Sequence, residues 1–146
     1  EDDGGFRIIA RSDDNAILFE SDADFTNWRQ HPLNEIAHAP VVLRAGGRTF
    51  VAGRARTNGG TNTKLWDLQL GESGRIARLN ELLTLPSAGD TSYAGMIADP
   101  SAPPENPAAF VSWYAQLDRG GGQSRGNASS VYVARVELAP EIVAAD

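Results

Sequence analysis

The chain has 146 residues, 41% of them hydrophobic and 22% charged, as is usual for a single globular domain with a sizeable core. Its formal net charge of −6 argues against a nucleic-acid partner, because phosphate binding needs a basic surface. The absence of cysteine excludes disulfides and thiolate zinc sites, and two histidines, both expected in one loop, disfavour a histidine metal site. We therefore expect no metal and no cofactor.

Two further features of the sequence concern membrane spans and the N-terminus. No apolar run approaches the roughly 20 residues that a membrane-spanning helix needs, so we predict no membrane span. The sequence begins with Glu1 rather than Met and shows no signal peptide. We therefore expect either that a leader was removed or that the chain is a piece of a longer protein.

Short runs of β-branched, aromatic and other apolar residues, separated by Gly, Asn, Asp and Pro, predict an all-β fold. The run 75–85 fits a helix as easily as a strand, and it ends at Pro86. Gly46 and Gly47 predict a tight hairpin, because glycine supplies the positive φ that such turns need. The predicted strands are 6–11, 16–20, 27–30, 40–45, 48–54, 64–70, 75–83, 93–99, 109–116 and 130–138.

Three of these strands resemble one another. Residues 6–11 (FRIIAR), 49–54 (TFVAGR) and 109–114 (AFVSWY) align, with their last residues 43 and then 60 positions apart. The longer spacing contains a Pro-rich insert at 99–107. A period near 40–50 residues with four strands per unit is typical of β-propeller blades.

The repeat divides the chain into about three four-stranded antiparallel blades, at residues 1–31, 37–84 and 88–138, followed by a tail at 139–146. The first blade lacks its innermost strand and the last its outermost. Three blades are too few to close a ring, since propellers typically have 4–8. We expect half of a propeller, whose other blades come from a preceding N-terminal half or from a second copy.

Residues 21–28 (SDADFTNW) resemble a degenerate Asp-box, the S-x-D-x-G-x-T-W turn, with an inserted Asn27 and no Gly. Further similarity lies in Pro40…Arg44…Gly53-Arg54 and in the runs 85–95 (LPSAGDTSYAG), 111–114 (VSWY) and 130–138 (SVYVARVEL). Over residues 6–138 the chain therefore resembles the C-terminal half of the sialidase-like (BNR/Asp-box) six-bladed β-propellers. The box is a marker of the fold, in which polar side chains bond the turn and the Trp packs between blades.

The resemblance implies a site on the channel face of the propeller. Sialidases hold the sugar carboxylate with arginines and use a tyrosine nucleophile with Glu and Asp partners. Arg11 and Arg54, at equivalent ends of second strands, correspond to two of these arginines, and Tyr93 corresponds to the nucleophile. Asp90, in the loop before Tyr93, is the second candidate catalytic residue.

Two more residues are candidates for substrate binding. His38 is expected in the loop before the middle blade, and Tyr114 aligns with Arg11 and Arg54. A third arginine, the Glu partner and the acid/base would have to precede Glu1, so we expect this chain to be inactive by itself.

Each candidate also has a purely structural interpretation. Tyr93 fits a core position of an inner strand, and Asp90 fits a turn-stabilising residue or an ion-pair partner of Arg54. Arg11 could be solvated or paired with a neighbouring aspartate, and His38 could cap a loop.

At the level of function, the first hypothesis is a secreted or periplasmic sialidase-like hydrolase that cleaves the glycosidic bond of an acidic sugar. The alternative is a non-catalytic propeller that binds glycans or proteins. Fold similarity by itself does not decide between them.

Overall fold

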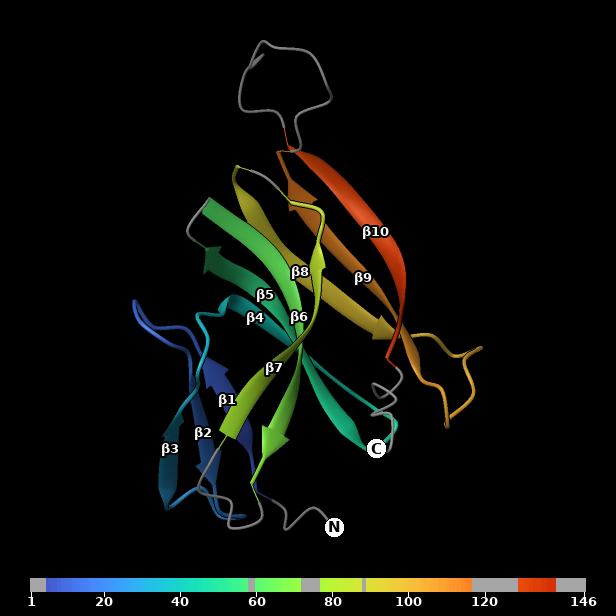
Figure 1. Ribbon diagram of the computed structural model, residues 1–146. Coiled ribbons are helices and arrows are strands. Elements are labelled where there is room, and N and C mark those ends of the chain that lie inside the picture. Colours follow the sequence, from blue (N-terminus) through green and yellow to red (C-terminus); the bar gives the residue numbers. More distant parts are fainter. Residues whose placement is uncertain (1–4, 58–59, 72–76, 88, 117–128, 139–146) are drawn as a thin grey trace, which may run out of the picture.

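The computed structural model describes residues 5–57, 60–71, 77–87, 89–116 and 129–138 (Figure 1). Within them the chain forms strands and no helix, which confirms the all-β prediction, and the described part of the run 75–85, residues 77–85, is a strand. The predicted tail, 139–146, lies outside the described residues. The strands are β1 (Arg7–Ala10), β2 (Ile17–Ser21), β3 (Trp28–Pro32), β4 (His38–Ala45), β5 (Arg48–Thr57), β6 (Gly60–Leu70), β7 (Ala77–Leu85), β8 (Thr91–Ala98), β9 (Ala108–Ala115) and β10 (Ser130–Glu137).

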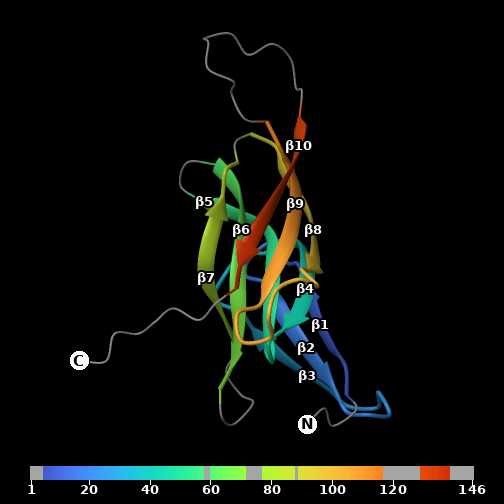
Figure 2. The same ribbon diagram turned by 90° about the vertical axis from the view of Figure 1, so that its right-hand side faces the viewer.

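These strands make three antiparallel sheets in chain order. Sheet I contains β1-β2-β3, sheet II contains β4-β5-β6-β7, and sheet III contains β8-β9-β10. Within each sheet, consecutive strands pair with one another, as in a meander. The sheets follow one another through the molecule, with sheet II between the other two (Figures 1 and 2). This arrangement is compatible with successive blades of a propeller.

Sheet II is buried on both faces. Consecutive side chains of its central strands point alternately into two separate cores. On β5, Val51 faces sheet I whereas Phe50 faces sheet III, and on β6 the same holds for Trp66 and Leu65. The core against sheet I contains Ile9, Ala16, Leu18, Leu33, Ala37, Val51, Ala55, Trp66, Leu68, Ala77 and Leu79. The core against sheet III is built around Phe50, Ala52, Leu65, Leu85, Ala109, Val111, Trp113, Ala115 and Leu138. The aromatic residues Trp66 and Trp113 are buried in these two cores, and Tyr132 packs against the second.

The first strands of sheets II and III, β4 and β8, share an irregularity of the backbone, as the predicted repeat would require. The pairing of β4 with β5 shifts between His38 and Val41, and that of β8 with β9 shifts between Ser92 and Gly95. Each irregularity contains a non-glycine residue with positive φ, namely Ala39 at 45° and Tyr93 at 46°. Both strands therefore begin with the same bulge.

Two predicted turns form. Gly46 and Gly47 have φ of 56° and 74°, as a two-residue hairpin of the primed type requires. In the turn that resembles an Asp-box, Asp22 accepts backbone hydrogen bonds from Thr26 and Asn27, and the hydrogen bonds from Asn27 lower the pKa of Asp22. Trp28 differs from the expectation: it lies exposed and donates to the carbonyl of Phe25, since its face of sheet I has no described sheet against it.

The core between sheets II and III can be tested at Leu65 and Leu83, which are cross-strand partners on β6 and β7. Leu65 is buried in the core against sheet III and Leu83 is exposed. Leu65→Ala should lower the free energy of unfolding by about 2–5 kcal/mol, because it leaves a cavity. Leu83→Ala, the matched control, should cost about 0.5 kcal/mol or less. Urea denaturation measures both, and equal costs would contradict the assigned core.

Candidate functional site

Hydrogen bonds connect the loop between β7 and β8 to both sheet II and sheet III. The Ser87 hydroxyl accepts from the backbone of Thr63, and the Trp113 indole donates to the Pro86 carbonyl at 3.0 Å. At the start of β8, the buried Thr91 hydroxyl donates to the Tyr114 carbonyl and accepts from the Thr63 hydroxyl, both at 2.7 Å. These bonds hold Ser87 and Thr91 at the junction of sheets II and III.

Asp90 is positioned within this loop by the chain on either side of it. Its backbone N–H donates to the Gln116 side chain, and its carbonyl accepts from the Gln116 N–H. Gly89 has φ of 59°, and a Cβ there would lie 2.5 Å from the Gln116 amide oxygen, so only glycine fits. The Asp90 carboxylate is thereby presented to Arg54, whose Nη1 lies 3.1 Å away.

Arg54 keeps hydrogen-bonding capacity beyond this ion pair. A guanidinium carries five N–H donors, and the bond to Asp90 uses one of them. Its Nε is buried without a partner, as is the hydroxyl of Ser92 on β8. Both of these atoms are shielded from solvent, but the Arg54 side chain as a whole is 24% exposed and is therefore partly accessible beside the ion pair.

Two tyrosines complete the cluster. The rings of Tyr93 and Tyr114 stack with centroids 5.9 Å apart. Burial raises the pKa of the Tyr114 phenol, and its hydrogen bond to the Asp90 carboxylate raises that pKa further. Tyr93 is 72% exposed, so its interpretation as a buried core residue is wrong.

Two candidates lie apart from the cluster's side chains. His38 is in β4 rather than in the loop before it; its backbone is opposite Arg54, but its ring donates from Nε2 to the Ser12 carbonyl at 3.1 Å. His38 thus connects sheet II to the β1–β2 loop. Arg11, in that same loop, is exposed and makes no hydrogen bond or ion pair with any residue that the structure describes. The structure therefore groups Arg54, Asp90, Tyr93 and Tyr114.

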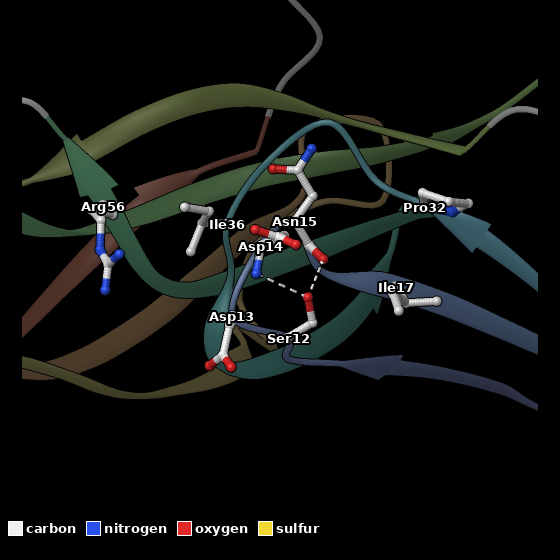
Figure 3. Close-up of a pocket in the computed structure, with 8 residues that line it drawn as sticks. All are labelled: Ser12, Asp13, Asp14, Asn15, Ile17, Pro32, Ile36 and Arg56. Carbon is white, nitrogen blue, oxygen red and sulfur yellow. Dashed lines mark hydrogen bonds between the residues drawn. The ribbon is translucent and has the colours of Figure 1, made fainter.

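A separate open depression lies between sheets I and II. Its volume is about 640 Å³, and Figure 3 shows the β1–β2 loop on one side and Arg56 of β5 on the other. The lining residues are Ser12, Asp13, Asp14, Asn15, Ile17, Pro32, Ile36 and Arg56. Arg11, Arg54 and Tyr93 do not line this depression.

Sequence reasoning missed the supporting residues of the site. Gln116, Thr63 and Thr91 hold the loop although they carry no obvious chemistry. One signal was available for Thr91: a hydroxyl residue directly after Gly-Asp and before an apolar strand is well placed to bond the turn. Thr63 and Gln116 lie 24 or more residues from Ser87, so no local pattern connects them with this loop.

Metal binding and membrane spanning can also be considered for the described residues. Among the described residues, no three His, Asp or Glu side chains are grouped so that they could hold a metal ion. The described part of the chain also contains no helix with the length and apolar character needed to cross a membrane.

Comparison of the chain with models of known protein families, with curated proteins and with solved structures finds no match. Assignment of a function therefore depends on the residues and their geometry.

The link between Asp90 and Tyr114 can be measured by titration. Asp90→Asn should lower the pKa of Tyr114, because the neutral amide no longer opposes formation of the phenolate. Phenolate absorbance followed through alkaline pH gives the pKa values, and subtraction of the Tyr114→Phe curve isolates Tyr114 from the other two tyrosines. Asp13→Asn, in the β1–β2 loop, is the control. An unchanged or raised Tyr114 pKa in Asp90→Asn would contradict the contact.

Proposed function

We propose that this chain is the sugar-binding part of a sialidase-like glycoside hydrolase that cleaves the glycosidic bond of an acidic sugar. The observation that carries the proposal is the cluster of Arg54, Asp90, Tyr93 and Tyr114 at the junction of sheets II and III. Arg54 on β5 and Tyr114 on β9 are equivalent in the repeat, Asp90 lies in the loop that enters sheet III, and Tyr93 lies near the start of β8. In a propeller, such positions lie on one face beside the central channel.

The residue types suit an acidic sugar. The guanidinium of Arg54 can bind a carboxylate through parallel hydrogen bonds, and its bond to Asp90 uses one of its five N–H donors. The exposed ring of Tyr93, stacked on Tyr114, offers a flat apolar surface next to that charge. A glycan with a carboxylate close to a hydrophobic ring face matches both features.

Tyr93 is the proposed nucleophile. In this step the phenol oxygen forms a bond to the anomeric carbon while the glycosidic bond breaks. The phenol proton passes to a base, and a general acid protonates the leaving oxygen. A neutral phenol avoids the repulsion that a carboxylate nucleophile would meet from an acidic sugar. Asp90, the second candidate catalytic residue, is paired with Arg54 and bonded to Tyr114, so the base that takes the Tyr93 proton would have to come from outside the described residues.

The proposed fold is half of a six-bladed propeller. The three antiparallel sheets, the repeated bulge at Ala39 and Tyr93, and the turn held by Asp22 support it. The six-blade count comes from the resemblance in the sequence.

The second candidate function is a non-catalytic glycan-binding propeller. One observation favours it: among the described residues, Tyr93 has no hydrogen-bonded carboxylate that could serve as its base. A binding role needs Arg54 and the tyrosine pair but no chemistry at the Tyr93 hydroxyl.

Binding by the 146-residue chain tests the shared part of both functions. We expect N-acetylneuraminate to bind more tightly than galactose in calorimetric titration, since only the former has a carboxylate. Arg54→Ala should weaken binding of the acidic sugar roughly 10–100-fold, the effect of losing hydrogen bonds to a charged group. Arg78→Ala, an exposed arginine on β7, should leave the affinity unchanged. Equal affinity for the two sugars, or for wild type and Arg54→Ala, would refute the site.

Hydrolysis separates the two functions. By itself the chain should bind a fluorogenic sialoside without turnover, because Tyr93 lacks a base among the described residues. Turnover that Tyr93→Phe abolishes, with binding retained, would assign the complete hydrolase activity to these 146 residues. Turnover that persists in Tyr93→Phe would remove this tyrosine from the chemistry.

A further inference from the structure

The two end sheets each leave one apolar face uncovered. On sheet III, cross-strand pairing places Ile97, Phe110, Val131 and Val133 on the face opposite the core, and all four are exposed. On sheet I the uncovered face includes Ile8 and Trp28, both also exposed. Contiguous exposed apolar surface of this kind marks an interaction site.

The outer face of sheet III repeats a face that is already buried elsewhere in the chain. Phe110 and Val133 occupy the positions that Phe50 and Leu65 occupy in sheet II, as the strand registers show. Phe50 and Leu65 are both 0% exposed because sheet III covers them, whereas Phe110 is 40% and Val133 67% exposed. The outer face of sheet III is thus built to receive another sheet in the way that sheet II receives sheet III.

The outer face of sheet I is complementary to the outer face of sheet III, because it corresponds to the opposite side of the interfaces between sheets within the chain. The repeat aligns Ile8 with Val51, which is 0% exposed against sheet I, while Ile8 is 49% exposed. Phe19, opposite Ile8 on β2, aligns with the buried Trp66. The outer face of sheet I therefore corresponds to the face by which sheet II packs on sheet I and sheet III packs on sheet II.

From these two faces we infer that a second copy of this chain packs head to tail on the first, with sheet III of each copy against sheet I of the other. The repeated interfaces inside the chain favour this occupant, because one chain carries both complementary faces. The inference rests on the repeat and is independent of sugar binding.

Such contacts close into a ring of two copies. Each interface is heterologous, and a heterologous interface gives either a closed ring or an open filament. Two copies provide six sheets, within the 4–8 blades of known propellers. Closure would also place sheet I of the partner beside Tyr93 and Tyr114, which border the uncovered face of sheet III.

Light scattering across a dilution series tests the assembly. Wild type should have twice the mass of the 15.6 kDa chain and dissociate on dilution. Ile8→Lys and Val133→Lys should each be monomeric, since each puts a charge into both interfaces of the ring. Leu83→Lys, at a similarly exposed leucine on β7, should remain dimeric. Circular dichroism checks folding, and Ile8→Thr or Val133→Thr replaces a lysine variant that unfolds.

Mixing the two variants tests the head-to-tail orientation. A mixed dimer of Ile8→Lys and Val133→Lys has one interface with both charges and one intact interface, so dimer should reappear in the mixture. A wild-type monomer at every concentration would overturn the inference. So would a dimer that Val133→Lys dissociates and Ile8→Lys does not, because that pattern indicates sheet III packed on sheet III.

Discussion

Burial of sheet II on both faces is the constraint on which the rest of the structure depends. Because consecutive side chains of a strand point to opposite faces, Phe50 and Val51, and likewise Leu65 and Trp66, supply two separate cores. A single slip of register would exchange the two sets of side chains and disrupt both cores at once. Sheets I and III are held in place through these two contacts, and so are the loops that run between the sheets.

The candidate site follows from that placement. Arg54 follows Phe50 and Ala52 at alternate positions on β5, on the face of sheet II turned towards sheet III, and Asp90 lies in the loop that connects the two sheets. The buried hydroxyls of Thr63 and Thr91 tie this loop to both sheets, so the ion pair stands on a rigid base. The hydrogen bond between these two hydroxyls is buried, and the low local dielectric strengthens it.

The strands and the repeat could be predicted because they depend on local alternation and on turn residues such as Gly46 and Gly47. β5 and β6 continue beyond the predicted ends, to Thr57 and from Gly60, because backbone pairing persists where the apolar pattern stops. The side-chain contacts of the site were harder to predict. The equivalence of Arg11 and Arg54 was read from aligned sequence, but only Arg54 meets a loop of the following sheet that carries a carboxylate.

The bulge shared by β4 and β8 has a consequence for Tyr93. A positive φ costs a non-glycine residue about 1–3 kcal/mol, and Ala39 shows that this conformation belongs to the repeated backbone rather than to the phenol. Glycine would relieve the strain at either position, so at Tyr93 stability and the proposed role of the phenol make opposite demands. The same strain fixes the direction of the Cα–Cβ bond, which turns the ring out of the sheet and towards solvent.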